Sequence, residues 1–328
     1  VYAGKQVKLK AREIANEGGV VQGQGGVELV AGGAILNTRG GLIAGQEVSL
    51  TAQSLRNEGG TLRAGIAGAP VATGTSATPG AANANAAGTQ GHLTIKTGGD
   101  VVNREQGLML AMGKLAIDAA NVDNTTQSRI VARDVDIDAR GNVGNLDSAI
   151  EADGTLAIDA ETIVNRKKAA APAAAAASSS SSSAPAPATP SGQIGALNVT
   201  LKARQSLDNA GRIEGGNVTV TTEALHNRAA GEILGQGGLV DIGTHTYDNA
   251  GKIHSTQAAK LTLTQGANLE IDAALKLPTA DQWLALKAND ITVGRDLASA
   301  GDLVLEASGA IRNLSLIHIS EPTRLLSI

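Results

Sequence analysis

Residues 48–65 read VSLTAQSLRNEGGTLRAG, and the same pattern returns along most of the chain. The unit opens with alternating apolar residues at 48–50 and continues through an apolar-x-Asn triplet at 55–57. Two glycines then lead into a second short apolar segment at 61–64. Alternation with a period of two predicts β-strands, and the Gly and Asn positions predict the turns between them.

The apolar-x-Asn triplet recurs about every 20 residues, which is the period of a solenoid repeat. Several short strands in each unit, with no helical periodicity, predict an all-β chain folded as a parallel β-helix. In such a fold each unit is one coil, and equivalent residues stack on one another. The Asn residues interpreted as structural turn positions are Asn16, Asn37, Asn57, Asn103, Asn124, Asn145, Asn165, Asn209, Asn227 and Asn249.

Composition supports this prediction and excludes several classes of protein. The 328 residues include 41 Gly, no Cys, no Phe and only 1% aromatic residues, so the core must consist of small aliphatic side chains. A hydrophobic fraction of 42% and a net charge of −4 keep the chain outside the disordered class. No basic run marks a nucleic-acid surface, and no apolar stretch is long enough to cross a bilayer.

The repeats divide the chain into segments of different character. Both long gaps between triplets have a low-complexity composition that cannot form a core, so they are expected to loop out from the same turn and leave the next coil in register. Around Pro278 and Trp283 the pattern fails, which predicts an irregular coil with a short helix. The expected segments are β-helix repeats at 1–65, 92–166 and 193–257, flexible insertions at 66–91 (Ala/Gly/Thr-rich) and 167–192 (Ala/Ser/Pro-rich), and an irregular continuation at 258–313.

Both ends of the chain carry signs of truncation. It opens at Val1 without Met or an apolar leader, so we expect an interior piece of a longer protein. Residues 314–328 fit no coil and resemble the translation of a sequencing-library adaptor, which predicts a non-native tail. Sequencing the source DNA across this junction tests that prediction.

The recurring Asn has a structural and a functional interpretation. Asn tolerates left-handed backbone at a turn, and its amide both donates and accepts, so stacked Asn residues would form a ladder. In that case Asn57→Ala should cost about 1–2 kcal/mol. The alternative is that the Asn column forms a recognition surface.

Stacked carboxylates are the best candidate for a bound ion. Asp118, Asp138 and Asp159 follow their strands at equivalent positions and would lie about 4.8 Å apart in neighbouring coils. A solvated face is the favoured interpretation, a calcium site the second and catalysis a remote third. The histidines show no metal-ligand spacing; they are His92, His226, His245, His254 and His318. We therefore expect no cofactor, no metal and no catalytic residue.

The repeat resembles the filamentous haemagglutinin repeats of two-partner-secretion exoproteins. Residues 55–62 and 207–213 carry the alternating strand, the apolar-x-Asn triplet and the following Gly step, and the resemblance covers most of 1–256. It implies a right-handed β-helical fibre exported through an outer-membrane pore partner to the surface of a Gram-negative bacterium or beyond. The secretion domain and the terminal toxin domains of that family have no match in this chain.

The resemblance implies a structural and adhesive role, not an enzymatic one. The expected function is a segment of a large secreted or surface-exposed fibre that attaches to host or neighbouring cells, with glycans or cell-surface proteins as ligands. The alternative is a passive stalk of a contact-dependent growth-inhibition toxin. A polysaccharide-degrading β-helix enzyme is the remote alternative.

Overall fold

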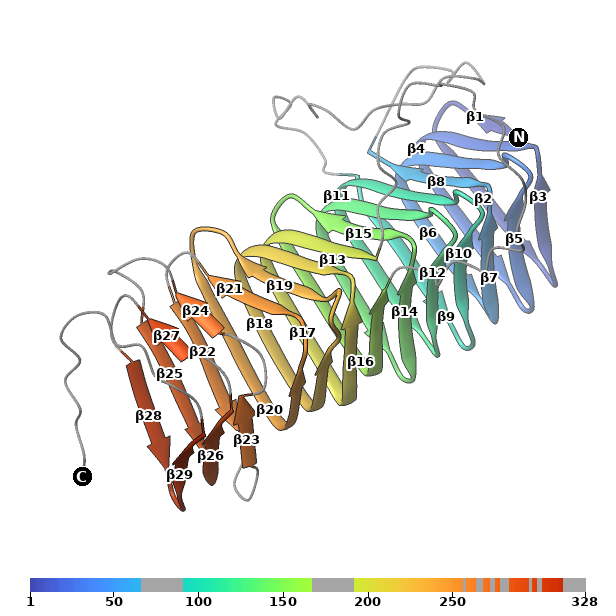
Figure 1. The fold of residues 1–328 in the computed structure, drawn as a ribbon. Coiled ribbons are helices and arrows are strands. Elements are labelled where there is room, and N and C mark those ends of the chain that lie inside the picture. Colours follow the sequence, from blue (N-terminus) through green and yellow to red (C-terminus); the bar gives the residue numbers. More distant parts are fainter. Residues whose placement is uncertain are drawn as a thin grey trace, which may run out of the picture.

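The computed structural model describes residues 1–65, 91–166 and 192–255, and 258–314 except 264–267, 272–274, 278–282, 295–296 and 300–302. Every regular element in these residues is a β-strand, and parallel strands stack into a β-solenoid of about 11 turns with roughly 21 residues each (Figure 1). This confirms the predicted all-β, parallel β-helical fold class. The predicted insertions fall almost entirely at 66–90 and 167–191, outside the described residues.

Each turn contributes strands to three faces of the solenoid, and the longer strands continue around a corner from one face to the next. The first face is exemplified by β9 (Leu93–Thr97), the Asn face by β10 (Val101–Arg104) and the third face by β8 (Thr61–Ala64). The other strands as far as β16 are β1 (Tyr2–Ala3), β2 (Gln6–Ala11), β3 (Ile14–Glu17), β4 (Val20–Ala31), β5 (Ala34–Thr38), β6 (Leu42–Ala52), β7 (Ser54–Glu58), β11 (Leu108–Ala119), β12 (Val122–Thr125), β13 (Arg129–Ala139), β14 (Asn142–Leu146), β15 (Ala149–Ala152) and β16 (Thr155–Arg166). The remaining strands are β17 (Gln193–Ala210), β18 (Arg212–Asn227), β19 (Glu232–Gly235), β20 (Leu239–Asn249), β21 (Lys252–Ser255), β22 (Ala258–Leu263), β23 (Asn268–Ile271), β24 (Leu275–Leu277), β25 (Trp283–Ala288), β26 (Asp290–Val293), β27 (Leu297–Ser299), β28 (Leu303–Ala307) and β29 (Ile311–Asn313).

Parallel pairing places each residue against its equivalent in the next turn. Asn57 pairs with Asn37 on one side and with Asn103 on the other, although 66–90 separate it from Asn103 in the chain. Strand β16 likewise pairs directly with β17 across 167–191. The turns that flank each gap therefore stack in register, as the sequence predicted.

The two gaps do not open at the same corner, and that expectation was wrong. Ala64, just before the first gap, pairs with Ala111 at the end of the third face. Arg166, just before the second gap, pairs with Ala210 at the end of the Asn face. Low-complexity composition indicates where the chain interrupts the repeat. It does not indicate whether the interruption follows the Asn face or the third face of that turn.

The core is a narrow column of aliphatic side chains inside the stacked turns. On the first face, alternate residues point inward, so Ile95, Ile117, Ile137 and Ile158 stack on one another and are at most 2% exposed. Burial of each such side chain contributes about 1.5–3 kcal/mol. Their outward neighbours are polar residues or alanine, which explains the period-two pattern in the sequence.

Beyond β21 the solenoid continues, but its sheets separate. Strands β22, β25 and β28 extend the first face within the main sheet, whereas β23, β26 and β29 form one small sheet and β24 and β27 another. Trp283 begins strand β25, and the described part of 258–314 contains no helix. Pro278 and residues 315–328, the part of the predicted non-native tail after Leu314, lie outside the described residues.

Candidate functional site

The ten Asn residues of the repeat form one continuous buried column. The Nδ2 group of each Asn donates to the Oδ1 atom of the next, over 2.7 to 2.9 Å, through nine successive bonds. The column runs from Asn16 to Asn249 and crosses both gaps in the chain. No member is more than 7% exposed, so the ladder offers its amides to neighbouring turns and not to a surface ligand.

Each ladder amide inside the column also satisfies its second donor. Asn37 Nδ2 donates to the carbonyl of Thr61 at 3.2 Å, and Asn124 Nδ2 donates to the carbonyl of Ala149 at 2.9 Å. Both carbonyls belong to the third face. The ladder therefore ties the Asn face to the third face within the core, and buried polar groups that are paired in this way carry little desolvation penalty.

The Asn residues themselves do not adopt left-handed backbone, so this part of the sequence interpretation was wrong. Their side chains point inward from strands, and the left-handed residues that follow them come two or three positions later, at the corner. Among the described residues the non-Gly examples are Arg39, Glu105, Gln106, Thr126, Gln127 and Asp147. A buried acceptor–donor side chain, not turn geometry, is the reason that Asn recurs.

The glycine that follows most of the triplets has a steric cause. A Cβ atom at Gly60 would lie 2.6 Å from Asn57 Oδ1 and 2.5 Å from Asn37 Nδ2, which is closer than real atoms approach. At two turns Ser128 and Ser148 replace the glycine, and their hydroxyls accept backbone N–H bonds from Gly107 and Ser128. Close approach to the ladder thus explains the Asn-then-Gly pattern.

The acidic column lies where the spacing predicted, and protein cations pair with two of its three carboxylates. Asp138 pairs in register with Asp118 and with Asp159 on the first face. Arg140 bonds Asp118 at 3.1 Å, while Lys202 and Arg204 bond Asp159 at 2.8 and 2.5 Å. In the described part of the chain no group of three or more His, Asp or Glu residues could hold a metal ion.

The described histidines lie apart on the outer surface. His92 Nδ1 accepts from the backbone N–H of Lys114 at 3.1 Å, and His226 Nδ1 lies 3.3 Å from an Asp248 carboxylate oxygen. His245 and His254 lie in β20 and β21, on different faces, and His318 lies outside the described residues.

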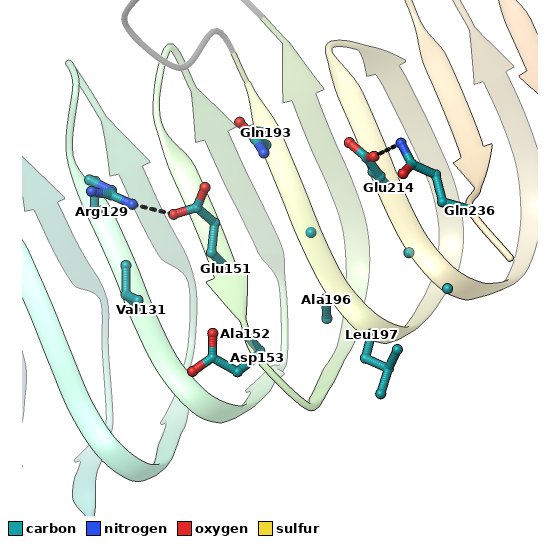
Figure 2. A pocket seen from close by; sticks show the side chains of 13 residues that line it. Arg129, Val131, Glu151, Ala152, Asp153, Gln193, Ala196, Leu197, Glu214 and Gln236 are labelled. Carbon is teal, nitrogen blue, oxygen red and sulfur yellow. Dashed lines mark hydrogen bonds and ion pairs between the residues drawn. The ribbon is translucent and has the colours of Figure 1, made fainter. Parts of the chain in front are cut away.

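A groove of about 640 Å³ crosses the third face and is the candidate binding site (Figure 2). It extends over successive turns, through β13, β15, β17 and β18 to the residue after β19. Six of the side chains that line it are charged or amide groups, and four are apolar. The residues that line it are Arg129, Val131, Glu151, Ala152, Asp153, Gln193, Gly195, Ala196, Leu197, Glu214, Gly215, Gly216 and Gln236.

The groove exists because one outward side chain is missing from a stacked column. Glu151, Gly195 and Glu214 occupy equivalent outward positions in three consecutive turns. Arg129 forms an ion pair with Glu151, and Gln236 donates a hydrogen bond to Glu214 from the far side (Figure 2). The Glu151 and Glu214 carboxylates therefore lie on either side of Gly195, where no side chain fills the column.

Electrostatically the groove is close to balanced. Arg212 Nε donates to Glu214 at 2.5 Å, and this hydrogen bond raises the pKa of Arg212 above its ordinary value. The Glu214 carboxylate is therefore neutralised by Arg212, as Glu151 is by Arg129.

The sequence alone did not predict this site, because Gly195 looks like one more turn glycine. The signal that could have found it is a Gly at an outward-facing position of a strand.

A second hollow, of about 510 Å³, lies near the first turns at the corner between the Asn face and the third face. Its charged groups are largely matched, because Arg39 bonds Glu17 at 3.1 Å and Arg104 bonds Glu58 at 2.8 Å. Without an opening in the outward column, this hollow is a weaker candidate than the groove at Gly195.

Comparison with models of protein families, with curated proteins and with solved structures gives no match for this chain. Among the described residues no helix has the length and apolar character needed to span a membrane. Fold, ladder and groove therefore carry the functional argument.

Proposed function

We propose that this chain is a structural and adhesive segment of a large bacterial fibre, secreted or exposed at the cell surface, that attaches to other cells or surfaces. The observation that carries the proposal is the unbroken Asn ladder from Asn16 to Asn249. It holds successive turns in one register, and a rod built in this way keeps a surface feature at a fixed place along the fibre.

The resemblance of the repeats to filamentous haemagglutinin gives the proposal its biological setting. By that resemblance, a pore-forming partner in the outer membrane of a Gram-negative bacterium exports the chain unfolded, and the solenoid forms outside. A chain with no Cys suits this route, because a disulfide would obstruct passage of the unfolded polypeptide. The role is non-enzymatic and needs no cofactor.

Direct binding to cells tests the adhesive proposal. The full chain coupled to fluorescent beads should attach to host epithelial cells or to neighbouring bacteria, and soluble chain should compete for this attachment. Beads that carry an unrelated acidic protein serve as the control. Binding no greater than that of the control would contradict the adhesive function.

The passive stalk of a contact-dependent inhibition system is the second candidate. Large apolar side chains are exposed at only a few places in the described residues, among them Met112 and Leu197. Most of the rod therefore has little exposed apolar surface with which to bind a partner. This candidate predicts no attachment by the beads. It also predicts a toxin domain and a small immunity gene in the DNA downstream of the repeats.

A further inference from the structure

We propose that the groove at Gly195 binds a neutral glycan chain that lies along the axis of the rod. This inference rests on the proposed adhesive function and assigns it a site. No residue of the groove belongs to the Asn ladder or to the acidic column. Its features are the open column position, the paired glutamates and a few exposed apolar side chains.

The shape of the groove suits an extended chain. Neighbouring turns lie about 4.8 Å apart, so the Glu151 and Glu214 positions, two turns apart, are separated by about 10 Å along the axis. The lining continues beyond them to Arg129 on one side and Gln236 on the other (Figure 2). The turn repeat is close to the advance per sugar in an extended polysaccharide, so successive sugars would meet equivalent positions of successive turns.

The charges of the groove select against a strongly charged ligand. Each of the two glutamates is already paired with an arginine, and Asp153 is the additional carboxylate of the lining. An anionic ligand would meet three carboxylates, and a cationic ligand at either glutamate would have to displace an arginine from its partner. Sugar hydroxyls require neither change, because each one donates to a carboxylate oxygen and accepts from a guanidinium or amide N–H.

The apolar part of the lining suits the C–H face of a sugar ring. Leu197 is 60% exposed at the edge of the groove, an unusual state for a large aliphatic side chain in this rod. Val131 and Ala196 add small apolar surfaces. The lining therefore places apolar side chains beside hydrogen-bonding groups, and a sugar has both a C–H face and hydroxyls to meet them.

A matched pair of glycine substitutions tests the proposal. A Cβ atom at Gly195 would meet nothing closer than 3.7 Å, so Gly195→Ile fills the groove without a backbone clash. Gly243, on the first face, is equally open, with its nearest atom at 3.9 Å, so Gly243→Ile adds the same side chain away from the groove. Circular dichroism and melting temperature should match the unsubstituted chain in both variants.

The probes are a panel of neutral β-linked glucose and galactose oligosaccharides, an oligolysine and whole cells, each tested with the full chain. We expect binding to at least one oligosaccharide, a loss of at least tenfold in Gly195→Ile and no loss in Gly243→Ile. Glu151→Ala, which removes a hydrogen-bonding group without filling the groove, should also weaken binding and provides the test if Gly195→Ile does not fold.

With the oligosaccharide and oligolysine probes, three results would overturn the proposal: no oligosaccharide binding, equal binding by Gly195→Ile and the unsubstituted chain, or binding of oligolysine in place of sugars. Attachment to cells separates the two levels of inference. If Gly195→Ile still attaches to cells as the unsubstituted chain does, the groove assignment fails while the adhesive function stands. If the unsubstituted chain does not attach to cells, the proposed adhesive function is wrong.

Discussion

At the scale of single residues, the ladder lets a buried Asn amide, which would otherwise destabilise the core, stabilise it instead. An isolated Asn amide in an aliphatic core would pay a desolvation penalty, but each amide in this column donates to one neighbour and accepts from the other. Its remaining donor reaches a carbonyl of the third face. Removing one member therefore affects three turns.

Asn57→Ala should lower the free energy of unfolding by about 1–2 kcal/mol, because it takes the acceptor from Asn37 Nδ2 and the donor from Asn103 Oδ1 in a buried site. Urea unfolding followed by circular dichroism measures this change. The control is Asn142→Ala, since Asn142 is exposed and solvent replaces its lost contact with Thr162. Equal effects of the two substitutions would contradict a ladder that stabilises the core.

A second residue-scale prediction concerns Asp123, on the outer side of the Asn face. Desolvation and then repulsion from Asp100 raise the pKa of Asp123, and Arg104 offsets this only in part. The folded state thus disfavours the charged carboxylate. The resulting loss of stability is absent below the unfolded-state pKa of about 3.9, grows as pH rises through the folded-state pKa and is constant above it.

Asp123→Asn should therefore raise the melting temperature at pH 7 and leave it unchanged at pH 3, where the carboxyl group is protonated in both states. Thermal unfolding of the two chains at the two pH values measures the difference. The same gain at both pH values would show that the change acts through packing and not through charge.

At the scale of elements, the corner after the first face is braced by arginines that reach past the adjacent turn. Arg204 lies at a bulge between β16 and β17, bonds Asp159 at 2.5 Å and donates to the carbonyls of Ala139 and Arg140 at 2.9 and 2.8 Å. Arg140 makes the equivalent bonds with Asp118, Thr97 and Gly98. The planar guanidinium bonds one carboxylate and two carbonyls through two separate nitrogens, whereas a lysine has a single ammonium nitrogen.

Arg204→Ala should cost about 1–2 kcal/mol of stability, and Arg204→Lys should recover little of it, because the forked contact with the two carbonyls is lost in both. Lys202→Ala is the matched control, since Lys202 also bonds Asp159 but makes only an exposed ion pair worth about 0–1 kcal/mol. Full recovery with lysine would contradict the proposed brace.

At the scale of the whole molecule, stability depends on contacts between neighbouring turns, as in other repeat proteins. The main sheet joins 24 strands, whereas the last turns place their Asn-face and third-face strands in sheets of three and two strands. The number of paired neighbours therefore falls toward the C-terminal turns. Local opening should follow the same gradient.

Amide hydrogen exchange should reveal this gradient. We expect the amides of β24 and β27, which form the two-stranded sheet, to exchange about tenfold or more faster than those of β9 or β11 in the main sheet. The intact chain is exchanged for timed periods and then digested, and mass spectrometry of the peptides measures both regions in one sample. Uniform protection would indicate that the separated sheets are as stable as the main one.

The repeat pattern by itself determined the fold class and the stacked columns. In a parallel solenoid with a nearly constant period, equivalent positions of successive repeats must lie on one another, so Asn57 beside Asn103 and Asp118 beside Asp138 follow from spacing alone. Alternation of apolar residues likewise determined which side chains face the core.

Only the tertiary structure decided what each column does. Whether Asp159 meets a metal ion or Arg204, which corner a gap opens at, and which residues take left-handed backbone depend on contacts that run diagonally between turns. The groove at Gly195 is likewise visible only when Glu151 and Glu214 are placed on either side of it. Periodicity determines position within a repeat, whereas pairing and hollows arise from the differences between adjacent repeats.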